Sequence, residues 1–336
     1  APATAGLIVL ISLVWDVVLD PLVGILADRV STPIGRYGPF ILIGAPLTAL
    51  SFALVFILPT SVAGHGFSLT LTSLLLFRTA YTLIDLPHNA LITSVSTNSA
   101  ERSRLAAFRF VFSSLAVIAI SLASFFVLSP DALSAQSERF RTFGLSIAVI
   151  ASAVVTLSWW SVRRFDRNPA SATWPGFVTQ LAHASSFLRD RDGFAVISYA
   201  FASALFIGLF GKALNYFAKY ELGEETLVSI GLTSMMIGQI VGALAFGRVS
   251  ERLEKAQAVQ IAGLCLVPAA ALFYLVGSIS PMGFALSSAL IGLGAGGVFT
   301  LIWSLAPDMV DKVEAESGQR SEAAFFGLVI VTMKMA

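Results

Sequence analysis

Ten long apolar segments dominate the sequence and restrict the chain to a membrane fold. A helix needs about 20 consecutive apolar residues to cross the hydrocarbon core of a bilayer. Only 12% of the residues are charged and 56% are hydrophobic, whereas an average soluble domain has about 25% charged residues. The pattern therefore predicts an all-α polytopic membrane protein. The segments run roughly over residues 5–27, 38–60, 67–97, 104–128, 142–162, 194–217, 226–247, 256–277, 282–306 and 322–336.

Both ends of the chain lie inside apolar runs. The sequence begins at Ala1 without a Met, and the last apolar segment has about 15 residues, which is too short to span a bilayer. We therefore expect the natural chain to continue at both ends, with one helix missing from each.

Basic residues alternate in number from loop to loop. One set of loops holds 14 Lys or Arg residues and the opposite set holds 3. The positive-inside rule places the first set in the cytoplasm. The first segment then runs from outside to inside and the last from inside to outside, so one further helix at each end would bring both termini to the cytoplasm.

A polar stretch at 163–192 divides the ten segments into five and five. We expect a helical bundle over residues 1–165, a cytoplasmic linker over 166–192 and a second bundle over 193–336, the linker carrying an amphipathic helix around Phe177–Leu188. Both halves repeat a motif of small residues followed by Arg, at Val23–Arg29 and Val241–Arg248. Two related halves around a midplane site are typical of secondary transporters.

Two acidic residues, Asp16 and Asp20, lie four apart in the first segment. A helix places such residues on one face. Each buried charge costs about 2.5–3.5 kcal/mol at a helix centre, and two close anions repel unless a cation or proton lies between them. The pair therefore predicts a site for a coupling cation, Na⁺ or H⁺. The alternative is a structural role, in which one or both acids pair with a base on a neighbouring helix.

The third segment carries polar side chains near its middle. Tyr81 and Asp85 share a helix face, Thr82 lies beside them, and His88 follows one turn beyond Asp85. A carboxylate and a phenol offer hydrogen bonds and ring stacking to a polar solute such as a sugar. The alternative is a packing network near the kink expected at Pro87. We expect His88 to line the pocket or hold a structural hydrogen bond rather than to relay protons.

The remaining charges within the apolar segments are basic: Arg78, Arg109, Lys212 and Lys334. Arg109 lies in the segment after Asp85, so we expect a salt bridge between the two, or a joint grip on sugar hydroxyls. Lys334 has no acid near it in the sequence. The Asp16/Asp20 pair is the partner we expect for it.

Three further features of the segments carry weaker signals. Arg78 and Lys212 are secondary candidates for function, and Lys212 fits a snorkelling or pairing residue. Glycines cluster at 292, 294, 296 and 297 without a following Gly-Lys-Ser/Thr, so they predict close helix packing and hinge freedom rather than a phosphate loop. Trp303 is either a core residue or a border of the cavity.

Taken together, these motifs resemble the glycoside–pentoside–hexuronide:cation symporter family of the major facilitator superfamily. Their order and spacing cover nearly the whole chain. The resemblance implies a twelve-helix fold, of which about ten helices are present, in the cell's inner (plasma) membrane. The matching motifs are Trp15–Pro21, Gly35–Pro39, Tyr81–Pro87, Glu101–Arg109, Asp308–Asp311, Gly318–Glu322 and, twelve residues later, Lys334.

The resemblance also implies roles for several of these residues. It implies sugar contacts at Asp85, Arg109 and Tyr81, to which we add His88 and Asn89 as substrate-binding candidates. It implies a cation site at Asp16, Asp20 and Thr82, bridged by Lys334, and we add Arg78 to this charge network.

Two positions depart from the family pattern. Leu19 stands where Na⁺-using members often have Asn, which weakens the case for Na⁺ in favour of H⁺. Asn89 stands where the melibiose carriers have a Trp, which weakens the case for melibiose.

We expect a secondary transporter that performs sugar:cation symport by alternating access. Cytoplasmic motif loops would latch the outward-facing state through Asp28, Arg29, Arg36, Arg248 and Arg252. We expect no catalytic residues, no cofactor and no metal beyond a coupling Na⁺. The expected partners are a small sugar or related polar solute, a monovalent cation and the lipid bilayer.

Other functions remain open at this point. An H⁺-coupled carrier of another polar solute or an organic anion would use Arg109 and Lys334 to hold a carboxylate. A non-transporting membrane sensor and a membrane-embedded enzyme are more remote, and no metal-ligand spacing supports the enzyme. The net charge of +1 gives no general attraction to nucleic acid, and the single Cys265 permits no disulfide within the chain.

Overall fold

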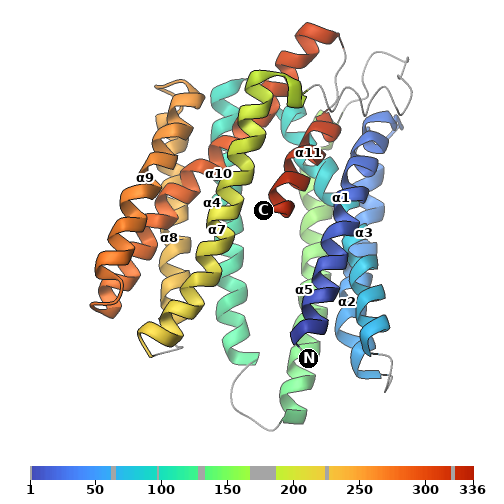
Figure 1. Ribbon diagram of the computed structural model, residues 1–336. Coiled ribbons are helices and arrows are strands. Elements are labelled where there is room, and N and C mark those ends of the chain that lie inside the picture. The colour runs from blue at the N-terminus through green and yellow to red at the C-terminus, as the bar shows by residue number, and fades with distance from the viewer. Residues whose placement is uncertain are drawn as a thin grey trace. The chain divides into compact units, whose positions relative to one another are not determined.

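The computed structural model describes residues 2–61, 66–96, 98–127, 133–166, 187–223, 227–318 and 322–336. Within these ranges the regular elements are helices, and nine of them are long and apolar enough to cross a membrane (Figure 1). The predicted all-α membrane architecture is therefore confirmed.

The chain forms two compact units. The first comprises residues 1–95, 124–190 and 312–335, and the second comprises 96–123, 191–311 and 336. Helices of the first unit are α1 (Pro2–Arg29), α2 (Gly38–Ser61), α3 (Gly66–Val95), α5 (Leu133–Val162), the 3₁₀ turn η1 (Arg163–Phe165) and α11 (Glu322–Met335). Helices of the second are α4 (Ser99–Val127), α7 (Arg191–Tyr216), the π-helical turn η2 (Phe217–Glu221), α8 (Leu227–Val249), α9 (Lys255–Val276) and α10 (Pro281–Ser317).

Each predicted apolar segment corresponds to one helix, but two helices extend well past the apolar run. α10 continues through Pro307 to Ser317, and α5 begins at Leu133. Hydropathy ends a segment at the first charges, whereas the backbone hydrogen bonds of a helix continue into the polar interface. The extension of α10 matters for function because it carries Asp308 and Asp311.

Both units combine helices from the two halves of the sequence. α11 packs against α1 and α3 in the first unit, and α4 belongs with α7–α10 in the second. The division into bundles at 1–165 and 193–336 therefore stays a prediction. Most of the predicted linker helix lies outside the described residues, but Phe187 at its end is buried against Phe325 of α11, with ring centroids 4.3 Å apart.

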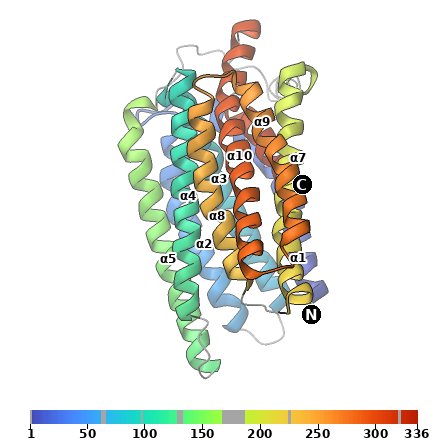
Figure 2. The same ribbon diagram turned by 90° about the vertical axis from the view of Figure 1, so that its left-hand side faces the viewer.

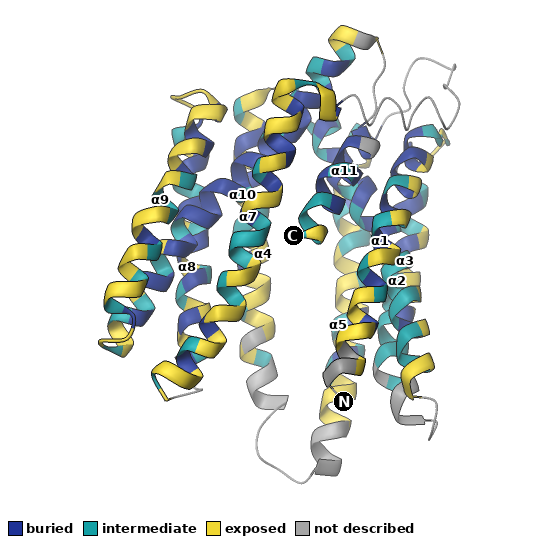
Figure 3. Ribbon diagram, viewed as in Figure 1, coloured by how far each residue is buried: buried dark blue, intermediate teal, exposed yellow. Residues whose placement is uncertain are grey.

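α10 is the most buried of the nine spans that the structure describes (Figure 3). The reason is close packing against α8 through glycine. A Cβ at Gly238 or Gly242 of α8 would overlap the backbone of α10, and a Cβ at Gly292 or Gly296 would overlap the backbone of α8. The packing role predicted for the glycine cluster is thus confirmed at Gly292 and Gly296.

Candidate functional site

Asp16 and Asp20 lie one turn apart on α1, and both are fully buried. The ammonium group of Lys334, on α11, bridges them: Nζ lies 2.8 Å from Oδ2 of Asp20 and 3.1 Å from Oδ2 of Asp16. The first and last long helices of the chain are therefore joined by an ion pair inside the first unit.

Two residues of α3 complete this cluster. Arg78 donates from Nη1 to Oδ2 of Asp16 at 2.9 Å, and the Thr82 hydroxyl donates to Oδ1 of Asp20 at 2.8 Å. Because both helices repeat the same four-residue spacing, each acid of α1 faces one of these two side chains. All five residues predicted for the cation site and its charge network thus lie together.

The charges of this cluster balance, yet one oxygen is left over. Two carboxylates face one ammonium and one guanidinium, so the formal charges cancel. Oδ1 of Asp16 is buried and accepts no hydrogen bond from any residue in the described part of the chain. A buried acceptor without a donor costs about 1–3 kcal/mol. A proton on this carboxylate, or a cation beside it, would remove that cost, so the residues present fit a coupling cation.

The side chains of α3 that are predicted to contact sugar have different neighbours within the first unit. Asn89 donates from Nδ2 to Oδ1 of Asp85 at 3.0 Å. His88 lies 3.3 Å from the hydroxyl of Ser158 on α5, which fits a structural hydrogen bond. Tyr81 stacks on Phe77 with ring centroids 6.0 Å apart. Tyr81 also lines an apolar cavity of about 180 Å³ whose other walls include residues of α2 and α5.

Arg109 lies in the second unit, where its guanidinium carbon sits 4.4 Å from the ring centroid of Trp303. Such a cation–π contact is worth about 0.5–2 kcal/mol, depending on desolvation. Trp303 is buried, with 7% of its surface exposed. Asp85 belongs to the first unit and Arg109 to the second, so the predicted pair between them stays a prediction. Lys212 is exposed on α7.

At the end of the first unit where α1 finishes and α2 begins, a second buried charge cluster forms. Arg36 pairs with Asp28 and, at 3.3 Å, with Glu322. The Tyr37 hydroxyl donates to Glu322 at 2.6 Å, and the Thr93 hydroxyl donates to its other oxygen at 2.7 Å. Burial raises the pKa of Tyr37 well above its usual range, so the phenol remains a donor. Of the predicted latch residues, Asp28 and Arg36 therefore lie together.

Asp166 supports this cluster from the far end of α5. Its carboxylate accepts hydrogen bonds from the backbone amides of Arg36, Tyr37 and Gly38, at 2.7–3.0 Å, and from the Trp159 indole at 3.1 Å. These amides are at the N-terminus of α2, where a helix favours an anion. The positive φ of Gly35, 107°, lets the loop close over the carboxylate.

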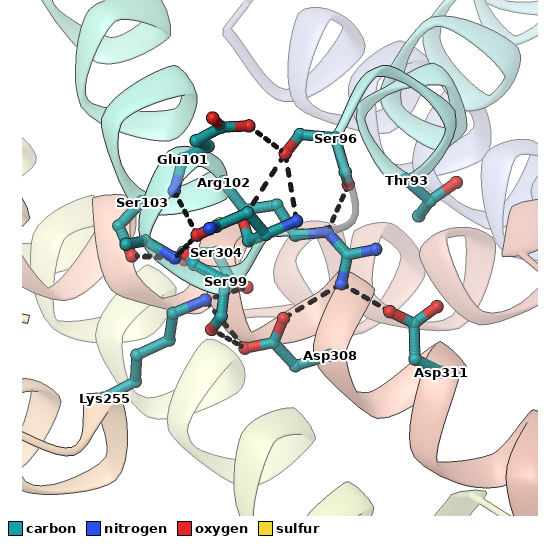
Figure 4. Close-up of polar contacts among 12 residues, drawn as sticks. Thr93, Ser96, Ser99, Glu101, Arg102, Ser103, Lys255, Ser304, Asp308 and Asp311 are labelled. Carbon is teal, nitrogen blue, oxygen red and sulfur yellow. Dashed lines mark hydrogen bonds and ion pairs between the residues drawn. The ribbon is translucent and has the colours of Figure 1, made fainter. Parts of the chain in front are cut away.

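A third cluster joins α4, α9 and α10 in the second unit (Figure 4). Nη1 of Arg102 lies 3.0 Å from Asp308 and 2.6 Å from Asp311. Lys255 lies 2.7 Å from the other oxygen of Asp308. The hydroxyls of Ser103 and Ser304 are 2.8 Å apart. α4 belongs to the first half of the sequence and α9 and α10 to the second, so this cluster holds the two halves of the sequence together.

Sequence reasoning missed several residues of these clusters. Glu322, Arg102, Asp308 and Asp311 lay in motifs that matched the family, but they carried no predicted role. Asp166 was read as the start of the linker. The sequence feature that could have identified these residues is their charge at the ends of apolar segments. The predicted latch residues Arg248 and Arg252 line a separate groove with Arg104 and Glu251.

The chain matches known transporters along its whole length. A family model described as MFS/sugar transport protein matches residues 1–336. The relative named "Putative glycoside/cation symporter YagG", of Escherichia coli (strain K12), is 25% identical over 98% of this chain and 71% of its own length. The sodium-dependent lysophosphatidylcholine symporter 1-A of Danio rerio is 27% identical over 100% of this chain and 68% of its own.

Solved structures of transporters share the fold. The E. coli fucose:proton symporter FucP superimposes with a TM-score of 0.59 at 16% identity, covering 98% of this chain and 89% of FucP. The proton:xylose symporter XylE of the major facilitator superfamily gives a TM-score of 0.69 at 11% identity, covering 99% of this chain and 77% of XylE. The match confirms the family resemblance read from the motifs. The chain belongs to the MFS/sugar transport protein family and is a multi-pass membrane transporter with the major facilitator fold.

Proposed function

We propose that this protein carries a sugar of the glycoside, pentoside or hexuronide class across the inner membrane together with a cation, by alternating access. The observation that carries the proposal is the buried cluster of Asp16, Asp20 and Lys334, with its one oxygen that lacks a donor. Charges within an apolar span are energetically costly, and such a cluster is therefore a candidate functional site. The name of the relative YagG, "Putative glycoside/cation symporter", supports the same assignment.

The cation acts at the carboxylate pair. With two acids and two bases, the cluster is formally neutral, and Lys334 occupies the position between the acids. A proton or Na⁺ that binds at Oδ1 of Asp16 weakens the attraction of the same carboxylate for Lys334, whose Nζ contacts Oδ2. Binding therefore loosens the tie between α1 and α11, and the cation gains a way to bias the conformation of the carrier.

The donor set favours a proton. Na⁺ is a hard cation that requires several oxygen ligands. Here Oδ2 of Asp16 already accepts a hydrogen bond from Arg78, Oδ2 of Asp20 accepts one from Lys334, and the Thr82 hydroxyl donates to Oδ1 of Asp20. Leu19 supplies no side-chain oxygen. A carboxylate oxygen that lacks a donor needs only one proton.

Each unit, taken by itself, holds polar groups proposed to contact the sugar. Asp85 and Asn89 offer an acceptor and a donor on α3. Arg109, held against the face of Trp303, offers a rigid fork of donors on α4. The charge clusters around Glu322 and Arg102 each join a helix of one half of the sequence to helices of the other half, so a rocking motion of the two halves would break them.

An organic anion is the second candidate substrate. The guanidinium of Arg109 on the face of Trp303 favours it, because this geometry also suits a carboxylate. An anion would need the positive charge of Arg109, whereas a neutral sugar needs only its donors. Arg109→Gln would then abolish transport of an anion and only weaken transport of a neutral sugar.

The test is uptake into proteoliposomes that contain the purified full-length protein. A panel of labelled neutral glycosides, pentoses, hexuronides and simple organic anions is offered under an imposed pH gradient, an imposed Na⁺ gradient or neither. We expect accumulation of a sugar under the pH gradient.

Accumulation that is the same with and without either gradient would refute coupling. Asp85→Asn with unchanged sugar affinity would refute the sugar site. Glu254→Gln, on an exposed acid at the start of α9 with no capping hydrogen bond, is the control.

A further inference from the structure

A groove of about 460 Å³ lies between α4 and α8 in the second unit, apart from the clusters described above. The two helices come close here, because a Cβ at Gly247 of α8 would lie 3.1 Å from the Cβ of Ala107 on α4. Figure 2 shows α4 and α8 as neighbours. The lining residues are Arg104, Ala107, Phe108, Leu244, Gly247, Arg248, Val249, Glu251 and Arg252.

The groove is polar at one end and apolar at the other. Arg104 lies near the start of α4 and Arg248 in the last turn of α8, so both are at the same membrane surface. One turn further into the membrane on each helix stand Phe108 and Leu244. The row of exposed apolar side chains continues inward with Phe112, 68% exposed, and Val241, 49% exposed.

The polar end carries an excess of positive charge. Three arginines and one glutamate leave a formal charge of +2. Arg104 donates two hydrogen bonds to the carboxylate of Glu251, of 2.6 and 3.1 Å. Arg248 and Arg252 are exposed, and neither has a carboxylate at ion-pair distance within the described part of the chain. Nη1 of Arg248 donates to the backbone carbonyl of Leu244 at 3.4 Å, and both guanidinium groups keep further N–H donors for an anion.

The position of the groove identifies the kind of anion. The excess of Lys and Arg places this end of α4 and α8 on the cytoplasmic side, where the leaflet is rich in anionic lipids. A soluble anion would use the arginines alone. A phospholipid matches the full pattern, since its phosphate reaches the arginines while an acyl chain follows the apolar row below them.

We propose that this groove binds one anionic phospholipid of the cytoplasmic leaflet, with the headgroup phosphate at Arg248 and Arg252 and an acyl chain against Phe108 and Leu244. The choline of a zwitterionic headgroup would meet the arginines with like charge, so the groove selects phosphatidylglycerol over phosphatidylcholine. The assignment holds for whatever solute the carrier transports, because no residue of the cation or sugar site lines the groove.

Native mass spectrometry of the delipidated full-length protein tests the proposal, with phosphatidylglycerol and phosphatidylcholine of the same acyl chains as probes. We expect one phosphatidylglycerol to bind roughly thirtyfold more tightly than phosphatidylcholine, from about 1 kcal/mol for each of the two arginines. The double variant Arg248→Gln/Arg252→Gln should lose this preference. The matched control, Arg189→Gln/Arg191→Gln, removes two exposed arginines outside the groove and should keep it.

A gain of binding guards against misfolding as the cause of a loss. Glu251→Gln removes the only carboxylate among the described residues that line the groove, and should tighten phosphatidylglycerol binding several-fold. Equal binding of the two lipids, or equal losses in both double variants, would overturn the proposal because charge on any part of the surface would then suffice. Competition by glycerophosphoglycerol as effective as that by the lipid would also overturn it, since the site would then take a soluble anion.

Discussion

The ammonium nitrogen of Lys334 lies 2.8 Å from Oδ2 of Asp20, although 314 residues separate the two in the sequence. It lies 3.1 Å from Asp16 as well, so one cation links both acids of α1 to α11. Three ionisable residues of the apolar segments are therefore in contact with one another. In the proposed mechanism, the same contact stabilises the first unit and responds to the coupling cation.

Lys334→Met should destabilise the protein by about 3–5 kcal/mol, because it leaves two buried carboxylates with only Arg78 as a basic partner. Adding Asp20→Asn should restore much of the loss, since the second change removes the orphaned charge. Thermal unfolding in detergent measures both. Lys212→Met, at an exposed lysine of α7, is the control. A double variant no more stable than Lys334→Met alone would argue against the pairing.

Gly35→Ala should destabilise the loop before α2 more than Gly223→Ala destabilises its own turn. Both glycines have positive φ, 107° and 71°, but a Cβ at Gly35 would also lie 2.5 Å from Cγ of Asp166, whereas nothing lies within 4 Å at Gly223. We expect a cost of about 1 kcal/mol at Gly223 from strain alone and about 2–3 kcal/mol at Gly35. Equal shifts in melting temperature would contradict the close approach of Asp166.

A disulfide between α4 and α10 should stop transport. The hydroxyls of Ser103 and Ser304 lie 2.8 Å apart, so cysteines there are expected to oxidise readily in a Cys265→Ser background. If the Arg102 cluster opens during each cycle, oxidised Ser103→Cys/Ser304→Cys should lose more than about nine-tenths of its uptake and regain it with reductant. Each single-cysteine variant is the control. Full uptake by the cross-linked protein would show that α4 and α10 do not separate.

The ion pair of Arg104 with Glu251 should give the stability a pH dependence at low pH. The hydrogen bond from Arg104 lowers the pKa of Glu251 below its usual range. A carboxylate whose pKa is lowered on folding contributes stability above its unfolded pKa of about 4.3, and this contribution is lost as the pH falls through the folded value. The Tm difference between the natural protein and Glu251→Gln should therefore be present at pH 7 and vanish at acidic pH. A difference that grew on acidification would contradict the pairing.

The helices and the cation cluster could be predicted from the sequence because the bilayer imposes simple costs. A charge in an apolar segment needs a partner, and Lys334 had only one pair of acids without bases beside them, so Asp16, Asp20 and Lys334 could be brought together without coordinates. Thr82 followed from the family motif, and the position of each span followed from hydropathy alone.

The polar clusters at the helix ends could not be predicted, because many charges lie at the ends of the apolar segments and any of many pairings among them would serve. Asp166 meets the amides of Arg36 and Gly38 about 130 residues away, and only the folded loop places it there. Tyr81 faces α2 and α5 because of the way α3 is rotated about its axis. The spacing of Tyr81 and Asp85 in the sequence does not determine that rotation.

Asp16→Asn in proteoliposomes tests the central claim most directly, by comparing sugar exchange with sugar accumulation. Exchange of labelled for unlabelled sugar at equilibrium needs the solute site but no net cation movement, whereas accumulation against a gradient needs both. If the cation acts at Asp16, the variant should keep exchange near the rate of the natural protein and lose accumulation driven by a pH or Na⁺ gradient. Accumulation at the natural level by Asp16→Asn would contradict the account.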